Sequence, residues 1–240
     1  MGARRFFVAD THAVGDRVLI EGSDAHKIVN VLRLSAGDVI EVADSGARVF
    51  DAILEFDAAR VYARLTLERA TPVPSGVTID VAQGIPKGQK MDYVVEKLTE
   101  LGVRGIIPLQ SERVVARDPG DAKLERWRRL ARAAAAQSGA ATIPEIEPVT
   151  TLDALTRRFE TYDAVIVPWE LAEPARLRDV LPGLGHGRIL VVIGPEGGFS
   201  HEEAEAVRTA GAALVSLGQR ILRTETAGLV LAGILRYQWD

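Results

Sequence analysis

Two hydrophobic patterns divide the chain near residue 72. Over the first seventy residues, short runs alternate apolar and polar positions, as strands with one buried face do. The pattern predicts strands over residues 4–8, 17–20, 38–43, 48–56 and 60–68, with one short helix over residues 23–33. We therefore expect a small β-rich domain with a barrel-like or sandwich-like fold.

From residue 77 onward, the pattern predicts strands that alternate with helices. The expected strands cover residues 77–83, 104–109, 163–167, 188–193 and 214–217, and the expected helices cover residues 89–101, 121–138, 151–159, 200–210 and 224–239. Alternation of this kind indicates an α/β domain with a mostly parallel sheet. Two prolines and a glycine mark residues 71–76 as a linker, so we place the domain boundary between residues 72 and 73.

The last expected helix is apolar on all sides over residues 227–235. A helix without a polar face must be covered by other protein. Part of it can pack on the sheet, and we expect the rest to contact a second copy of the chain in a homodimer. Complete burial within one chain is the alternative.

Composition is that of an ordinary globular protein, since 47% of the 240 residues are apolar and 26% are charged. No apolar stretch reaches the ~20 residues that a membrane span needs, and the first residues lack the apolar core of a secretory signal. We therefore expect a cytoplasmic protein. The chain has no cysteine, which excludes a thiolate nucleophile, an iron–sulfur cluster and a disulfide. Its four histidines are scattered, so a metal site is not expected.

The formal net charge of −4 argues weakly against a nucleic-acid partner, but the charge is uneven. Residues 71–140 carry 11 Lys and Arg against 8 Asp and Glu, with four arginines at positions 126, 128, 129 and 132. This run is either a patch that meets phosphates or a solvated helix face.

The candidate ligand site lies where the parallel strands end, because ligands bind at the carboxyl edge of such sheets. Three loops stand out there, at residues 167–170, 193–200 and 217–227. The pair Gly197-Gly198 lets the backbone approach a ligand closely. Neither a P-loop motif nor a dinucleotide-binding motif is present, so loop backbone would have to hold an adenosine-type ligand.

In the third loop, an apolar pair, Ile221 and Leu222, lies between Arg220 and Arg223. This arrangement fits the floor of a pocket with charges at its rim. Alternatively, the apolar pair caps the core and Arg223 pairs with a nearby carboxylate, that of Glu225 or of the last residue.

Six motifs occur in order along the chain: HKIVNVLR at 26–33 with Gly-Asp at 37–38, KGQKMD at 87–92 with KLTELGV at 97–103, SERVV at 111–115, QSG at 137–139 with IPEI at 143–146, IGPEGGF at 193–199, and LGQRILRTETA at 217–227. Each motif is weak alone, but six in order are specific. Together they resemble the RsmE-type family of SPOUT methyltransferases, which methylate N3 of a uridine in small-subunit ribosomal RNA.

The resemblance implies a PUA-like RNA-binding domain over residues 1–72 and a SPOUT methyltransferase domain with a deep trefoil knot over residues 73–240. The knot follows from the resemblance alone, since base rates run against knots. The resemblance also implies S-adenosylmethionine as the cofactor, a homodimer and no metal. Carried over by position, the cofactor-binding residues are Pro168, Trp169, Glu170, Ile193, Gly194, Pro195, Glu196, Gly197, Gly198, Leu217, Gly218, Ile221, Leu222, Thr224, Thr226 and Ala227.

The reaction suggests roles for two further residues. Uracil N3 carries a proton at neutral pH, so its methylation requires that the proton be removed or the developing anion be stabilised. We expect Arg223 to stabilise the anion and Glu225 to accept the proton. Methylation at C5 through a cysteine adduct is excluded, because the chain has no cysteine.

The expected RNA partner is the small-subunit ribosomal RNA, within an assembled 30S subunit, with the target base turned out of its stack. The candidate RNA-binding residues are Arg4, Arg5, Lys27, Arg33, Arg113, Arg126, Arg129 and Arg132. One departure affects this interface: the family usually has an acidic residue and an arginine where this chain has Ala136 and Ala140.

Three alternatives stay open at this point. The chain could be a SPOUT enzyme that methylates a ribose 2′-oxygen or guanine N1. It could also be a non-catalytic RNA-binding or ribosome-assembly protein with a degenerate pocket, or an enzyme that acts on a small molecule.

Overall fold

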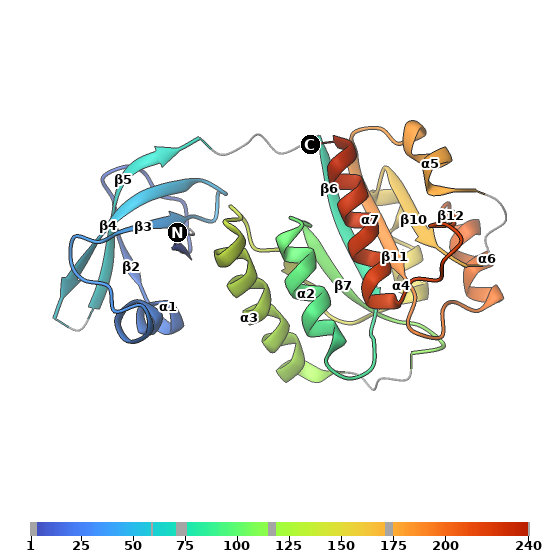
Figure 1. The fold of residues 1–240 in the computed structure, drawn as a ribbon, viewed down its shortest axis with the longest axis horizontal. Helices are drawn as coiled ribbons and strands as arrows, with labels where there is room; N and C mark the ends of the chain where they lie inside the picture. The colour runs from blue at the N-terminus through green and yellow to red at the C-terminus, as the bar shows by residue number, and fades with distance from the viewer. Residues whose placement is uncertain (1–3, 59, 71–75, 115–118, 171–174, 240) are drawn as a thin grey trace. The chain divides into compact units, whose positions relative to one another are not determined.

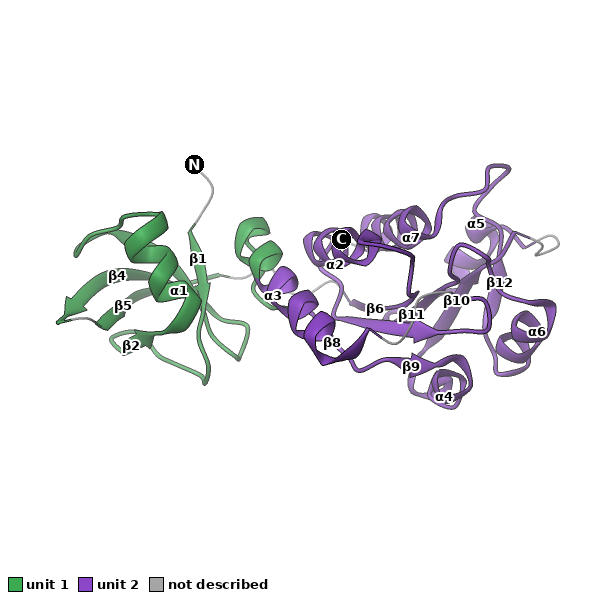
Figure 2. Cartoon of the chain, turned by 90° about the horizontal axis from the view of Figure 1, so that it is seen from below, with its two compact units in different colours: residues 1–73, 133–143 green, residues 74–132, 144–240 purple. Residues whose placement is uncertain are grey.

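The structure is a computed structural model that describes residues 4–58, 60–70, 76–114, 119–170 and 175–239. The chain divides into two compact units (Figure 2). Unit 1 contains residues 1–73 and 133–143, and unit 2 contains residues 74–132 and 144–240. Helix α3 (Gly120–Ser138) therefore contributes its first part to unit 2 and its last turns to unit 1. The expected linker lies outside the described residues, except for Gly76.

Unit 1 is built on a five-stranded sheet in the order β1-β3-β4-β5-β2, which curls on itself (Figure 1). Its strands are β1 (Arg5–Phe7), β2 (Arg17–Ile20), β3 (Val39–Ala43), β4 (Val49–Asp57) and β5 (Arg60–Arg69). A bulge between Asp51 and Ala52 bends the pairing of β4 with β5. The inner face buries Phe6, Phe50 and Leu54. The prediction of a small β-rich domain is confirmed.

The expected helix over residues 23–33 forms in two parts. An α-helix, α1 (Gly22–His26), continues into one turn of π-helix over Lys27–Val31, and Ile28 is buried in the core. The helix ends two residues before the expected end, and Arg33 adopts a left-handed backbone with φ 53°.

Unit 2 contains a seven-stranded sheet in the order β12-β10-β11-β6-β7-β8, with β9 paired to β7. The strands are β6 (Val77–Gly84), β7 (Gly105–Gln110), β8 (Glu145–Ile146), β9 (Thr150–Thr151), β10 (Ala164–Pro168), β11 (Gly187–Ile193) and β12 (Ala213–Val215). All of these pairings are parallel, so the prediction of a parallel α/β sheet is confirmed.

Successive strand residues point to opposite faces of this sheet, and helices cover both faces. Helix α7 (Thr224–Trp239) packs against β6, β11 and α2 (Lys90–Glu100) on one face (Figure 1). On the other face, Ala82 and Val192 share a core with residues of α4 (Leu152–Thr156) and α6 (His201–Thr209). Strands β6 and β11 are thus buried on both sides, and in β11 the apolar run Ile189–Ile193 agrees with this burial.

Several short elements differ from the predicted pattern. The expected helix over residues 151–159 ends at Thr156, and a separate 3-10 turn forms over Phe159–Thr161. The two-residue strands β8 and β9 and the short helix α5 (Leu177–Val180) were not predicted. In the part of the chain that the structure describes, no helix is long and apolar enough to cross a membrane.

Candidate functional site

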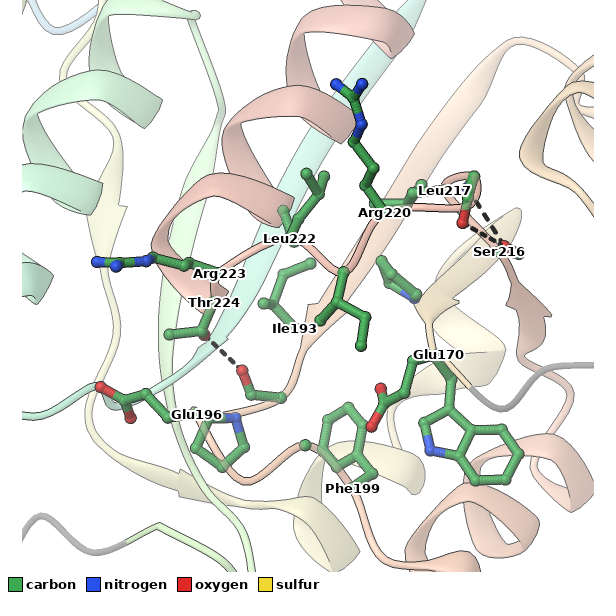
Figure 3. A pocket seen from close by; sticks show the side chains of 18 of the residues that line it. Glu170, Ile193, Glu196, Phe199, Ser216, Leu217, Arg220, Leu222, Arg223 and Thr224 are labelled. Atoms are coloured by element: carbon green, nitrogen blue, oxygen red, sulfur yellow. Dashed lines mark hydrogen bonds between the residues drawn. The ribbon is translucent and has the colours of Figure 1, made fainter.

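A pocket of about 650 Å³ lies at the carboxyl ends of β10, β11 and β12 (Figure 3). Its volume falls in the ~300–1,000 Å³ range of small-molecule sites. The lining residues are Lys90, Pro168, Trp169, Glu170, Ile193, Gly194, Pro195, Glu196, Gly198, Phe199, Ser216, Leu217, Gly218, Gln219, Arg220, Ile221, Leu222, Arg223, Thr224 and Ala227. Three loops supply nearly all of them, and these are the loops that the sequence singled out.

The loop after β11 contains three glycines, and it turns tightly at Gly198. Gly198 has φ 64°, and its N–H donates to the Pro195 carbonyl at 2.9 Å. A side chain at position 198 would also crowd Glu170, whose Oε1 lies 3.0 Å from where the Cβ would be. The chain then enters α6 through a capping box, in which Ser200 Oγ accepts from the Glu203 N–H at 3.2 Å. The loop is therefore fixed at both ends.

The pocket combines apolar walls with two carboxylates. Ile193, Leu217 and Leu222 contribute the apolar part, and in Figure 3 the carboxylate of Glu170 lies beside the ring of Phe199. Ile221 is 85% exposed, so it does not cap the core as one alternative proposed.

Glu196 is held by donors from the start of α2. Its Oε1 accepts from the Lys87 N–H at 3.0 Å and lies 3.3 Å from the Lys90 Nζ. Burial alone would raise the pKa of Glu196, but hydrogen bonds from backbone N–H groups and from Lys90 lower it below its usual value. Glu196 is therefore ionised at neutral pH.

A charged cluster lies at the start of α7. The Glu225 side chain is 14% exposed, and its carboxylate lies 3.3 Å from Lys90 Nζ and 3.9 Å from an Arg223 guanidinium nitrogen. Arg223 is 80% exposed, and its guanidinium extends away from Thr224 (Figure 3). This places an exposed cation at the rim of the pocket, beside a carboxylate that is already paired with Lys90.

The predicted cofactor residues line this pocket with two exceptions. Thr226 is not among the lining residues, and Gly197 instead packs against Arg113, which donates to the Gly197 carbonyl at 3.0 Å. The lining residues outside the predicted cofactor-binding and catalytic sets are Lys90, Phe199, Ser216, Gln219 and Arg220. Most of these lie within or beside the three loops. Lys90 has a different signal, since it follows the carboxyl end of β6.

The candidate RNA-binding residues of unit 1 differ in exposure. Arg4 and Arg33 are exposed and Lys27 is partly buried. Arg5 is only 10% exposed, because its guanidinium donates to Glu41 at 2.7 Å and also to the Gly139 carbonyl. A phosphate would have to compete with Glu41 for Arg5.

In unit 2, Arg126 donates to Asp92 at 2.7 Å, so it ties α3 to α2. Arg129 is exposed on α3, and Arg132 is partly buried. In unit 1, Ala136 and Ala140 pack against an apolar cluster that includes Phe7. The positions where the family usually has charged residues are thus occupied by small side chains against the core.

The pocket fits S-adenosylmethionine in size and in donor set. Its volume and apolar walls suit an adenine ring, and Glu170 offers an acceptor for hydroxyl or ammonium groups. The buried Trp169 Nε1 has no hydrogen-bond partner among the described residues, so this donor is available to a ligand. Those residues contain no group of three or more His, Cys, Asp or Glu side chains that could hold a metal ion.

Comparison with known proteins agrees with this geometry. Residues 73–236 match the sequence profile of an RNA methyltransferase domain. The chain is 33% identical to the ribosomal RNA small subunit methyltransferase E of Bacillus subtilis, over 92% of this chain and 90% of that protein. It is 31% identical to the protein of the same name from Mycobacterium bovis, over 100% and 95% of the two chains.

Solved structures resemble the whole chain. A ribosomal RNA small subunit methyltransferase E from Neisseria gonorrhoeae, bound to S-adenosylmethionine, superimposes with a TM-score of 0.88, at 30% identity over 99% of this chain and 98% of that one. A Legionella pneumophila methyltransferase structure, also with this cofactor bound, gives a TM-score of 0.89 at 28% identity over the same shares.

Proposed function

Since the chain belongs to the RNA methyltransferase family whose profile it matches, we propose that it transfers the methyl group of S-adenosylmethionine to N3 of a uridine in small-subunit (16S) ribosomal RNA. The observation that carries this proposal is the pocket: its walls are formed by the 193–199 and 217–227 segments, which also carry the resemblance to the family. A non-catalytic RNA-binding protein would not need a pocket of this size at these loops.

The cofactor would be held mainly by loop backbone and apolar side chains. Ile193, Leu217 and Leu222 would cover its adenine, and the carboxylate of Glu170 would accept hydrogen bonds from its polar groups. When bound, S-adenosylmethionine supplies a methyl group on a positively charged sulfur, which makes that methyl group electrophilic. The tight turn at Gly198 brings the loop backbone close to Glu170.

Arg223 and Glu225 would act on the uracil ring. The Arg223 guanidinium, exposed at the rim, is free to turn toward a base and would stabilise the negative charge that forms when N3 loses its proton. Glu225 would accept that proton, directly or through a water molecule. Lys90, 3.3 Å from Glu225, adds a second cation at the same place and would compensate the charge of the carboxylate.

RNA recognition would be shared by the two units. Residues 1–72, which form most of unit 1, would act as a PUA-like RNA-binding domain. Its Arg4, Lys27 and Arg33 would contact RNA, and Arg5 would do so only after leaving Glu41. Residues 73–240 would form the SPOUT domain with its trefoil knot. The arginines of this domain that would contact RNA phosphates are Arg113, Arg126, Arg129 and Arg132. Because phosphate contacts release counterions, affinity for the ribosomal subunit would fall steeply as salt rises.

Helix α7 supports a homodimer. Val230, Ile234 and Tyr237 lie three and four residues apart on this helix and are 37%, 36% and 90% exposed. On α2, which packs beside α7, Tyr93 is 50% exposed. An apolar stripe at this spacing is typical of a helix that packs against another protein surface. Sedimentation of the wild type and of Ile234→Asp would test the dimer, since a buried aspartate should convert it to monomers.

The function is tested by incubating the purified protein with methyl-labelled S-adenosylmethionine and small ribosomal subunits that lack the modification. We expect label in the 16S RNA, and less with Gly197→Val, whose Cβ would lie 3.1 Å from the Arg113 Cβ and would press on the loop. Binding of the cofactor without any transfer to RNA would instead support a protein with a different substrate. Absence of both binding and transfer would refute the proposal.

A further inference from the structure

A buried glutamine lies beneath the pocket without lining it. Gln83 occupies the carboxyl end of the central strand β6 and is 0% exposed. Its Nε2 donates to the Gly84 carbonyl at 3.1 Å and to Thr224 Oγ1 at 2.8 Å. A buried carboxamide is costly unless it is hydrogen-bonded, so a role that only filled space would be better served by an apolar side chain.

The hydrogen bonds of Gln83 continue to a second loop. Thr224 Oγ1 donates to the Gly194 carbonyl at 2.5 Å (Figure 3). Since a hydroxyl has a single proton, and Thr224 donates that proton to Gly194, its hydroxyl must accept in the contact with the Gln83 amide. The direction of every bond is therefore fixed, from β6 through the first residue of α7 to the loop after β11. Thr224 and Gly194 both line the pocket.

The Oε1 atom of Gln83 explains why α7 has a glycine at position 228. Oε1 has no hydrogen-bond partner among the described residues, and a Cβ at position 228 would lie 3.2 Å from it. Glycine costs about 1 kcal/mol relative to alanine within a helix. The missing side chain at Gly228 leaves room for the Gln83 amide. By contrast, a Cβ at Gly233 of the same helix would have nothing within 4 Å.

We propose that Gln83 is a positioning residue for methyl transfer: it holds Thr224 and Gly194 in fixed relation, so that the pocket is formed before the cofactor arrives. The same contact fixes the start of α7, where Arg223 and Glu225 are placed. Preorganisation of this kind improves binding because less order must be imposed when the ligand enters. The inference rests on the proposed function and adds to it a residue that does not touch the ligand.

The test measures the dissociation constant for S-adenosylmethionine by calorimetry in the full-length protein. Gln83→Met keeps the volume but removes the donors, and Thr224→Val keeps the shape but removes the hydroxyl. We expect each to raise the dissociation constant about tenfold, which corresponds to ~1.4 kcal/mol. The double variant should be no weaker than the single ones, since both break one chain of bonds. Thr224→Ser, which retains the hydroxyl, should bind like the wild type.

Kinetics separate positioning from general stability. In Gln83→Met, the KM for the cofactor should rise while the KM for the ribosomal subunit stays unchanged. A merely structural residue would lower the unfolding temperature and leave both constants as they are.

The two α7 glycines provide a matched pair. Gly228→Ala would press on the Gln83 amide and should weaken cofactor binding severalfold, whereas Gly233→Ala should leave binding unchanged. If Gln83→Met does not fold, this pair of variants, together with Thr224→Val and Thr224→Ser, still tests whether Gln83 positions the pocket for the cofactor.

The outcomes distinguish the two claims. Wild-type affinity in Gln83→Met, Thr224→Val and Gly228→Ala, with the wild type binding and methylating, would overturn the inference and leave the proposed function standing. Fully additive losses in the double variant would also overturn it, because they would mean independent contacts. A wild type that neither binds S-adenosylmethionine nor methylates RNA would overturn both.

Discussion

The contact between strand β6 and the loop after β11 makes Gly84→Ala a sharp test of how the pocket is built. Gly84 is the last residue of β6, and a Cβ there would lie 2.5 Å from the Pro195 nitrogen and 2.8 Å from the Gly194 carbonyl carbon. Ordinary contact begins at 3.4 Å, so the overlap is roughly 1 Å. Because both atoms belong to backbone, neither can rotate away, and the loop or the strand must move.

The expected cost is therefore near the upper end of what overpacking produces, about 3 kcal/mol. For a protein of this size, 1 kcal/mol shifts the unfolding temperature by about 2–4 °C, so we expect a decrease of roughly 6–12 °C. The same shift displaces Gly194 and Pro195 from the pocket wall, so the affinity for S-adenosylmethionine should also fall.

Scanning calorimetry and cofactor titration measure the two effects. Gly185→Ala is the matched control, since position 185 has open space and no left-handed backbone, and its stability should change by less than ~0.5 kcal/mol. If Gly84→Ala unfolded at the same temperature as Gly185→Ala and bound the cofactor equally well, the packing of β6 against this loop would be wrong.

Three further predictions concern the catalytic pair, a helix cap and pH. Arg223→Ala should lower kcat by about 100-fold with an unchanged cofactor affinity, because the arginine acts on the base; a loss confined to cofactor binding would contradict its role. Ser200→Ala removes the cap of α6 and should lower the free energy of unfolding by about 1 kcal/mol. An unchanged free energy of unfolding would show that the cap does not stabilise the protein. The pKa of Glu196 is lowered in the folded state, so its contribution to stability is present above its ordinary value of 4.5 and is lost as the pH falls below it. Thermal unfolding between pH 6 and 3 should therefore show a flatter pH dependence in Glu196→Gln, and identical slopes would oppose the assignment.

Most of the fold could be predicted from periodicity, because its strands and helices are long enough to show a period. The five strands of unit 1 begin and end within one residue of the predicted positions, and α7 covers the predicted residues. Strands β8 and β9 have two residues each, which is too short for any alternation to appear. The unexpected end of α4 has the same cause: five helical residues contain too few turns to distinguish a helix from a turn followed by a 3-10 segment.

The candidate site was found by a topological rule, that ligands bind at the carboxyl ends of parallel strands. The rule identified the loops after β10, β11 and β12, which form the pocket. It missed Lys90 because the loop after β6 was not treated as part of the same edge, although β6 pairs with β11. Gln83 had a visible signal, a polar residue at the end of a buried strand, but its link to Thr224 spans 141 positions and needs the folded chain.

The resemblance to the methyltransferase family and the expectation of S-adenosylmethionine as cofactor are confirmed by the relatives and by the cofactor-bound structures. The knot, the homodimer and the roles of individual residues stay predictions. Side-chain pairing changes one expectation in practice, because Arg5 and Arg126 are already bound to carboxylates and so contribute less readily to an RNA surface than exposed arginines such as Arg4.

The most direct test of the central claim is the identity of the methylated nucleoside. Small ribosomal subunits that lack the modification are treated with the protein and S-adenosylmethionine, and their 16S RNA is digested and analysed by mass spectrometry against nucleoside standards. We expect a single new species, N3-methyluridine, which is absent when Arg223→Ala replaces the wild type. A ribose-methylated nucleoside or N1-methylguanosine would contradict the proposed chemistry of Arg223 and Glu225 while leaving the cofactor pocket in place.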